Sequence, residues 1–267
     1  MTPCGDPMGQ AIDPNDWDHH WDAYGEFEKG NPASDYRQAL IVKLLGRPPA
    51  GSTVLDIGSG QGQFALRLQE MYPDVVMWGV DFSAEGVTRS REHAAQRGSA
   101  AKFRQADLLK PTTLADGQPM ATHAVCSEVL EHVADPVTLI RNARALLAPG
   151  CQLLVTVPGG PRSAFDHHIG HFQHFNAGKL RQVLTDAGYD VRRVLRAGFP
   201  FFNLYKLAVI ARGKKLIADL EQRAPGQAVP GEAIQKAFGF CLRHSLDNAP
   251  FGWQMVAVAI VPVRDRS

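Results

Sequence analysis

The sequence has no apolar run long enough to cross a membrane. Its longest apolar stretches, at 199–211 and 253–263, fall short of the ~18 residues that a spanning helix needs. The N-terminal residues also lack the basic start and the apolar segment of a secretion signal. We therefore expect a soluble protein that has no membrane partner.

Cysteine is scarce too, and its pattern does not support a disulfide framework or a cysteine-rich metal site. No two cysteines have the spacing of such sites, and two of them lie in apolar runs typical of strands. We expect reduced thiols and a cytoplasmic location. The four cysteines are Cys4, Cys126, Cys151 and Cys241.

An excess of charge of one sign is also missing. Lys and Arg total 28 against 27 Asp and Glu, which gives a formal net charge of +1, and there is no run of like charges. Non-specific attraction to a phosphate backbone depends on such an excess. Nucleic acid is therefore not an expected partner.

What the chain does have is a regular alternation of strand and helix patterns from residue 52 onward. Short β-branched runs and amphipathic segments follow one another, separated by Pro or Gly. This alternation predicts an α/β protein with a parallel, doubly wound sheet. The predicted strands are 52–58, 75–81, 101–107, 122–127, 151–160, 189–196 and 253–263; the predicted helices are 16–27, 35–46, 63–73, 83–98, 136–150 and 178–190.

A glycine loop, GSGQG, directly follows the first of these strands. Such loops let a ligand approach the backbone, and alone they fit dinucleotide-binding proteins as well. Asp56, two residues before the loop, can hold a ligand's ammonium group. Asp81, at the end of the second strand, is placed to bond ribose hydroxyls. Asp107, after the third strand, can accept a hydrogen bond from an adenine amino group.

The segments LDIGSGQG, GVDFS, QADLL and ALLAPGCQLLVTVP together resemble the class I S-adenosylmethionine-dependent methyltransferases. The resemblance implies a Rossmann-like seven-stranded sheet of order 3-2-1-4-5-7-6, with its last strand antiparallel, helices on both faces and a helical lid. The pattern of elements along the chain predicts an N-terminal cap (1–50), a cofactor-binding core (51–197), a helical insertion over the acceptor site (198–250) and a last core strand (251–267). The implied S-adenosylmethionine ligands are Asp56, Gly58, Gly60, Asp81, Phe82, Asp107, Leu108 and Ser127.

An upstream segment, GNPASDYRQALI, is similar to one that precedes the glycine loop in ubiquinone-type O-methyltransferases. An arginine there binds the cofactor carboxylate, and the matching residue is Arg37. The alternative for Arg37 is a place on a solvated helix face.

The stretch SEVLEH, after the fourth predicted strand, holds Glu128, Glu131 and His132. If the chain is helical there, these three residues share one face. Two adjacent carboxylates repel unless a cation lies between them, and oxygen ligands with an imidazole suit Mg²⁺, Mn²⁺, Fe²⁺ or Zn²⁺. This E-x-x-E-H pattern resembles small-RNA 2'-O-methyltransferases, where it binds a divalent metal, and ubiquinone-biosynthesis O-methyltransferases.

Four histidines follow the fifth predicted strand, in FDHHIGHFQHF. The resemblance makes His171 the fourth metal ligand, beside Glu128, Glu131 and His132. Glu131 is also a candidate catalytic residue. Without a metal, a histidine is the general base, with His171 preferred over His168, and the two glutamates are scaffold or substrate contacts. His174 is expected on the surface of this segment.

The predicted function is O-methylation of a small molecule that carries a phenol, catechol or sugar hydroxyl, for example in secondary metabolism. The expected partners are this methyl acceptor and a second copy of the chain in a homodimer. Alternatives are RNA 2'-O-methylation, N-methylation of a small molecule, a cofactor-binding protein that does not methylate, and a nicotinamide-dependent dehydrogenase. Aromatic residues of the 198–250 insertion, such as Phe202 and Tyr205, are candidates for contacting the acceptor.

Overall fold

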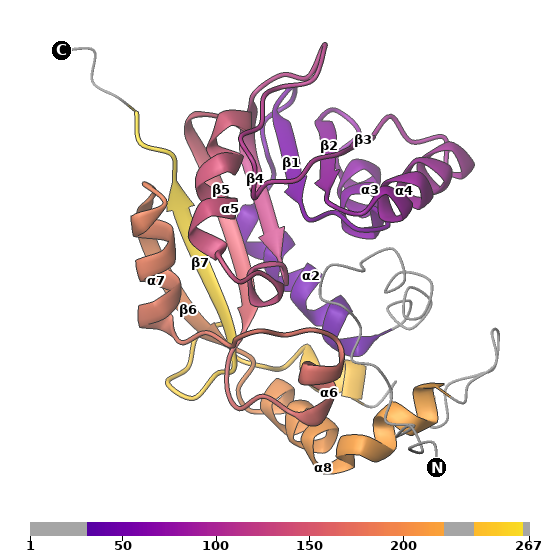
Figure 1. Cartoon of the computed structure of the whole chain (residues 1–267), viewed down its shortest axis with the longest axis vertical. Coiled ribbons are helices and arrows are strands. Elements are labelled where there is room, and N and C mark those ends of the chain that lie inside the picture. The colour runs from indigo at the N-terminus through magenta and orange to yellow at the C-terminus, as the bar shows by residue number, and fades with distance from the viewer. Residues whose placement is uncertain (1–30, 222–237, 264–267) are drawn as a thin grey trace, which may run out of the picture.

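The computed structural model describes residues 31–221 and 238–263 and contains a seven-stranded sheet with helices on both faces (Figure 1). The strand order is β3-β2-β1-β4-β5-β7-β6, which confirms the predicted order. Strand β7 runs in the opposite direction to the other six strands of this sheet. The strands are β1 (Thr53–Ile57), β2 (Val76–Asp81), β3 (Lys102–Gln105), β4 (Ala121–Ser127), β5 (Leu147–Pro158), β6 (Asp190–Ala197) and β7 (Gln254–Ile260).

The helices begin where the sequence supplies capping side chains. Ser83 accepts a hydrogen bond from the N–H of Gly86, and Asp135 and Asn176 cap their helices in the same way. The predicted helix at 16–27 lies outside the described residues. The described helices are α2 (Pro32–Leu45), α3 (Gln63–Met71), α4 (Ala84–Gln96), α5 (Pro136–Ala143), α6 (Ala164–His168), α7 (Ala177–Asp186) and α8 (Phe201–Glu221).

Two hydrophobic cores, one on each face of the sheet, follow from the alternation of side chains along its strands. Val54 of β1 packs with residues of α2, α3 and α4. Its neighbours Leu55 and Ile57 pack on the opposite face with residues of α5 and α7. All five residues of β1 are buried, as expected for a central parallel strand.

The largest difference from a predicted boundary lies between α5 and β5. The sequence predicted a helix over 136–150, but α5 ends at Ala143 and a short 3₁₀ turn spans Arg144–Leu146. Strand β5 then begins at Leu147, which pairs with Ala121 of β4. Pairing with β4 therefore outweighs the helical pattern of this stretch.

Helices α6 and α8 lie beyond the carboxyl ends of the parallel strands, as Figure 1 shows. Tyr36 of α2 and Phe202 of α8 pack with their ring centroids 5.5 Å apart, so the N-terminal helix and the insertion share one core. Among the described residues, none of the helices has the length and apolar character that crossing a bilayer demands.

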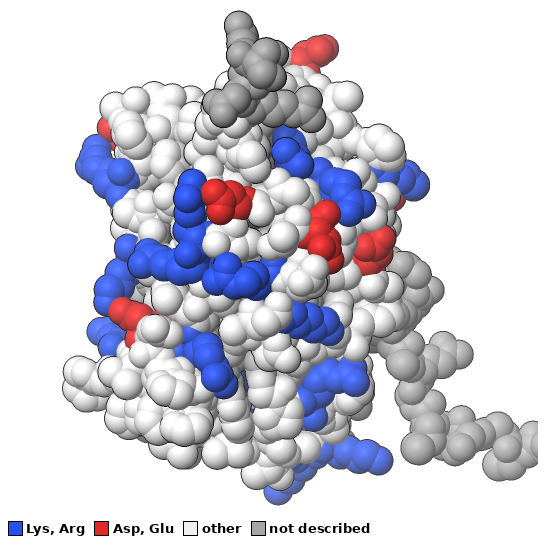
Figure 2. Space-filling view, turned by 90° about the vertical axis from the view of Figure 1, so that its left-hand side faces the viewer, with Lys and Arg blue, Asp and Glu red and all other residues white. Residues whose placement is uncertain are grey.

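The face on the left-hand side of Figure 1 carries basic side chains with acidic ones among them (Figure 2). Strand β6 forms an edge of the sheet, and its exposed Arg192 pairs with Asp190 at 3.1 Å. Arg181 of α7 donates to the backbone oxygen of Val191. These contacts within the chain account for Arg192 and Arg181, so neither arginine requires an anionic ligand from outside the protein.

Candidate functional site

A cleft of about 450 Å³ opens at the carboxyl ends of the parallel strands, where open α/β sheets bind ligands. Most of the predicted site residues line it. Gly60 and His168 are the two predicted residues that are absent from its described lining. The predicted residues in the lining are Arg37, Asp56, Gly58, Asp81, Phe82, Asp107, Leu108, Ser127, Glu128, Glu131, His132 and His171.

The glycine loop is held in place by Asp81. One carboxylate oxygen of Asp81 accepts from the N–H of Gly60 at 2.7 Å, and the other accepts from the N–H of Ser83 at 2.8 Å. Gly58 has a φ of 73°, and a Cβ there would lie 2.3 Å from Val129 Cγ2. Only glycine therefore fits at Gly58 without a shift of its neighbours.

Asp56 is buried at the end of β1, with 4% of its surface exposed. Burial and the charge of Asp81 raise its pKa to about 7, while a hydrogen bond from the Ala65 backbone lowers it. A carboxyl in this state gains most from a cationic ligand, since the cation restores the ionised form. The role of Asp56 in binding an ammonium group stays a prediction.

Asp107, Leu108 and Phe82 line another part of the cleft. One oxygen of Asp107 accepts from the N–H of Leu109 at 3.0 Å, and the other lies 2.9 Å from the Lys110 ammonium. Phe82 is 46% exposed, which leaves its ring available to a planar ligand.

Glu128 does not share a helical face with Glu131 and His132, contrary to expectation. Its φ is 55°, and the 3₁₀ turn that follows spans only Leu130–His132. The Glu128 carboxylate accepts hydrogen bonds from Thr156 at 3.0 Å and Gln254 at 2.8 Å. Its second oxygen lies 3.7 Å from Nε of Arg37. The structure thus separates Glu128 from the other predicted metal ligands.

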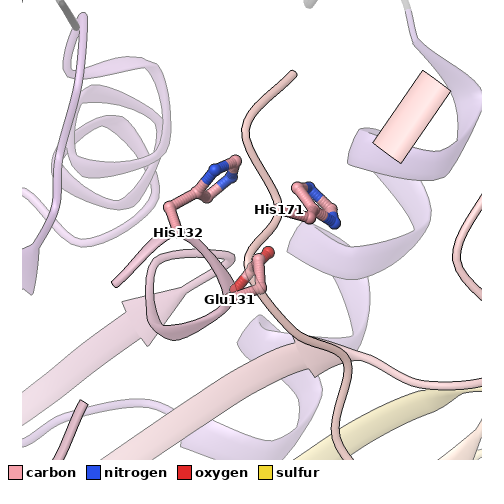
Figure 3. Close-up of side chains that lie close together, drawn as sticks. All are labelled: Glu131, His132 and His171. Carbon is pink, nitrogen blue, oxygen red and sulfur yellow. The ribbon is translucent and has the colours of Figure 1, made fainter. Parts of the chain in front are cut away.

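Glu131, His132 and His171 gather in the cleft, and we call them the Glu131 cluster (Figure 3). One potential ligand atom from each residue lies within 4.8 Å of the other two. The rings of His132 and His171 meet edge to face with centroids 4.5 Å apart. Three of the four predicted metal ligands are therefore brought together.

The Glu131 carboxylate is fully buried, and neither of its oxygens has a hydrogen-bond partner. Burial, followed by the charge of Glu128, raises the pKa of Glu131 well above its ordinary value. Buried polar atoms are rarely left without a partner, and a bound cation is one explanation for such a pair of oxygens. The backbone oxygen of Glu131 accepts a hydrogen bond from Phe172 N at 2.8 Å. This bond connects the turn at 130–132 to residues 165–175, which we call the histidine segment.

A second group of residues, which the sequence did not reveal, lies beside the cluster. We call Asp166, His171, His174 and Lys206 the Asp166 network. Lys206 of α8 donates to the Asp166 carboxylate at 2.9 Å, and Ser163 donates to it through both its N–H and its hydroxyl. Burial raises the pKa of Asp166, but Lys206 and Ser163 outweigh it and lower that pKa to about 2.

Two histidine predictions need comment. The side chain of His174 is only 6% exposed, so its predicted surface position was wrong. His174 turns inward because Gly160 O and the His171 ring both offer it hydrogen-bond partners. His168 ends α6, and its predicted role as a second-choice base stays a prediction.

Comparison with known proteins gives a consistent family. The profile of the family described as "Methyltransferase domain" matches residues 24–194. A ubiquinone biosynthesis O-methyltransferase of Pseudomonas paraeruginosa is 30% identical over 178 residues, which cover 66% of this chain and 71% of that protein. The enzyme of the same name from Vibrio vulnificus is 29% identical over 201 residues, 70% of this chain and 78% of that one.

Solved structures share the fold at much lower identity. Phosphoethanolamine N-methyltransferase 2 of Haemonchus contortus, in complex with S-adenosyl-L-methionine, superimposes with a TM-score of 0.64 at 17% identity. The match covers 94% of this chain and 60% of that one, less than two thirds of its length. The [4+2]-cyclase SpnF gives a TM-score of 0.63 at 17% identity, covering 95% and 98%. A fold shared with a cyclase does not by itself determine the reaction.

Proposed function

This chain belongs to the methyltransferase-domain family, and from that premise we propose that it methylates a hydroxyl group of a small organic molecule. By family and by fold it is a class I S-adenosylmethionine-dependent methyltransferase. The similarity to ubiquinone biosynthesis O-methyltransferases supports oxygen as the acceptor atom. Phenols, catechols and sugar hydroxyls are the proposed acceptors. A cytoplasmic location and a homodimer are parts of the same proposal.

The cofactor supplies an electrophilic methyl group on a sulfonium when it is bound. Asp56 offers a buried carboxylate for its ammonium group, and Asp81 holds the glycine loop and faces the position proposed for the ribose. Asp107 and Leu108 line the end proposed for the adenine. Arg37 lies beside Glu128 in the lining and is the proposed partner of the cofactor carboxylate.

The acceptor end of the cleft is apolar and aromatic. Phe165 and Phe172 line it from the histidine segment, and Phe202 and Tyr205 line it from α8. Rings of this kind suit a planar organic acceptor and exclude water around the reacting atoms. The hydroxyl would then lie toward the Glu131 cluster, the polar group at this end.

The chemistry of the Glu131 cluster fits a divalent cation. Burial and the neighbouring His132 lower the pKa of His171 to about 2, so the ring is neutral and a poor proton acceptor. A neutral imidazole is the form that binds metals, and two imidazoles with one carboxylate suit several divalent ions. A bound metal would lower the pKa of the acceptor hydroxyl and orient it. The observation that carries this proposal is the pair of unpartnered Glu131 oxygens.

In the metal-free alternative the fold is the same, and His171 or Glu131 accepts the proton of the acceptor hydroxyl. Glu131, with its raised pKa, is then the stronger base of the two once it is ionised. RNA 2'-O-methylation and N-methylation of a small molecule stay secondary proposals. The near-neutral chain charge disfavours RNA.

The deciding experiment measures metal content and metal-dependent turnover. The purified protein is stripped with a chelator, and release of S-adenosylhomocysteine is followed with a panel of phenols, catechols and sugars, with and without Mg²⁺, Mn²⁺ or Zn²⁺. We expect a metal to restore turnover in the wild type but not in Glu131→Gln. Turnover that ignores the chelator, together with loss of activity in Glu131→Gln, would reject the metal and retain O-methylation. An absence of product with every hydroxyl in the panel would reject the acceptor class.

A further inference from the structure

His174 bridges a backbone carbonyl and the His171 ring. Its Nδ1 lies 3.0 Å from Gly160 O, and its Nε2 lies 3.1 Å from Nδ1 of His171. A carbonyl oxygen only accepts hydrogen bonds, so Nδ1 of His174 must carry a proton. The position of this proton decides what the other nitrogen of the ring can do.

The side chain of His174 has no close anionic partner that would hold a second proton. Asp166 lies 3.9 Å from its Nε2 and already accepts a hydrogen bond from Lys206. At pH 8 the ordinary state of an imidazole such as His174 is neutral. Its Nε2 therefore keeps a lone pair and accepts the proton of His171 Nδ1. The Asp166 carboxylate lies 3.7 Å from this Nδ1 and 3.9 Å from Nε2 of His174, too far from either for a hydrogen bond, so the direction of the bond between the rings is set by the proton on His174 Nδ1.

We propose that His174 is a positioning residue that holds His171 in the tautomer protonated on Nδ1, so that Nε2 of His171 keeps the lone pair. A neutral imidazole can bind a metal or take a proton only through its unprotonated nitrogen. Fixing the tautomer through the second nitrogen is how proteins orient such rings.

The carbonyl that starts this chain of hydrogen bonds is itself fixed. Gly160 has a φ of 73°, and a Cβ there would lie 2.7 Å from the Trp253 ring. The peptide is packed against Trp253 and has little room to turn. Arg162 donates to the backbone oxygens of His171 and Phe172, at 3.2 and 2.7 Å, which holds the segment that carries both histidines.

Asp166, His171 and His174 also lie close enough together to bind a metal. The Lys206 ammonium on the Asp166 carboxylate argues against that use, because a cation already occupies it. The hydrogen bond between the two rings likewise occupies one nitrogen of each. The group therefore serves as a hydrogen-bonded support for His171.

The use of the His171 lone pair rests on the proposed function, whereas the tautomer does not. The first test is therefore made on the ligand-free full chain, by two-bond ¹H–¹⁵N correlation spectra of the histidine rings at pH 8. We expect His171 and His174 both to be protonated on Nδ1, with unprotonated Nε2 signals. A His171 ring protonated on Nε2 would overturn the proposal, whatever the activity assay shows.

The second test compares three variants. His174→Phe keeps an aromatic ring but lacks both ring nitrogens. His174→Gln supplies one hydrogen-bond donor and one acceptor in their place. The exposed His167 on the same segment provides the control His167→Phe. We expect kcat to fall about 10- to 100-fold in His174→Phe, with recovery in His174→Gln and no change in the control. The His171 signals should shift toward the other tautomer only in His174→Phe.

Affinity for S-adenosylhomocysteine and far-UV circular dichroism show whether each variant is folded. If His174→Phe does not fold, the proposal is still tested by the His171 tautomer in the wild-type spectrum and by the kcat of His174→Gln. A folded His174→Phe with an unchanged His171 tautomer would refute the proposal. Inactivity of the wild type toward every hydroxyl, with the expected tautomer, would reject the proposed function alone.

Discussion

The two ends of the cleft each contain a buried acid, but they treat it differently. Asp56 lies beside the glycine loop, where its pKa is raised to about 7 and a backbone N–H partly compensates its burial. Glu131 lies at the histidine end, where burial and the charge of Glu128 raise its pKa well above the ordinary value and neither carboxylate oxygen has a hydrogen-bond partner. The first site is built from one contiguous strand-loop-helix unit. The second combines residues from three separate segments: the turn 130–132, the segment 163–174 and α8. The two acids therefore differ in whether their neighbours are close or distant in the sequence.

The largest effect should come from neutralising the local acid with Asp56→Asn. The unfolded carboxyl has a pKa of 3.8 and the folded one about 7, so folding is penalised progressively as pH rises between these values. Removing the charge should therefore stabilise the ligand-free protein by roughly 4 kcal/mol above pH 7, and by almost nothing at pH 4.

The same variant should lose roughly a hundredfold or more in cofactor affinity, since a charged partner of the ammonium is gone. Urea unfolding at pH 4 and pH 8 and calorimetric titration with S-adenosylhomocysteine measure the two effects. If Asp56→Asn is less stable than the wild type at pH 8, the ionised Asp56 carboxylate does not destabilise the ligand-free protein, and the prediction is wrong.

The ion pair at the histidine end should give the next largest effect. Lys206→Met leaves the Asp166 carboxylate, which is 2% exposed, without its cation, and should cost roughly 3 kcal/mol in the free energy of unfolding. Arg97→Met, which removes an exposed pair with Glu70, should cost less than about 1 kcal/mol. Equal losses in the two variants would mean that the Asp166 network is no more than surface pairing.

Metal addition should distinguish the two acids directly. A divalent ion at a hundred times its Kd should stabilise the folded protein by about 2.7 kcal/mol, seen as a rise in Tm with Mn²⁺ or Zn²⁺. The rise should vanish in Glu131→Gln and persist in Asp56→Asn. A rise that survives in Glu131→Gln would place the ion elsewhere.

The smallest effect should come from the loop itself. Gly58→Ala introduces a Cβ 2.3 Å from Val129 at a positive φ and should cost about 2 kcal/mol, with weaker cofactor binding. Gly98→Ala, also at positive φ but with nothing within 4 Å, should cost less. The double variant Gly58→Ala with Val129→Ala should regain part of the loss; no recovery would mean that backbone strain alone is responsible.

The contrast between the two ends also explains what the sequence could predict. The glycine loop, Asp56 and Asp81 lie at fixed spacings along one strand-loop-helix-strand pattern, so their convergence follows from the fold class. The sheet order was predicted through the same motifs, and the structure confirms it.

The histidine end was predicted only in part, because its contacts join distant segments. Glu128 leaves the expected helical face since Thr156 and Gln254, 28 and 126 residues away, bind its carboxylate. Lys206 and Asp166 are 40 residues apart, and no periodic pattern signals their pairing. The one available signal was the S-x-x-D capping box formed by Ser163 and Asp166.

Strand β7 lies between β5 and β6, although it is the last strand in chain order among the described residues. Strands β1 to β5 and the glycine loop, in contrast, all precede residues 198–250 in the chain. Gln254, which holds Glu128, and Trp253, which packs against Gly160, arrive only afterwards. The contacts that hold Glu128 and pack Gly160 therefore depend on residues that are added late, whereas the glycine loop and the Asp81 carboxylate that holds it are encoded early in the chain.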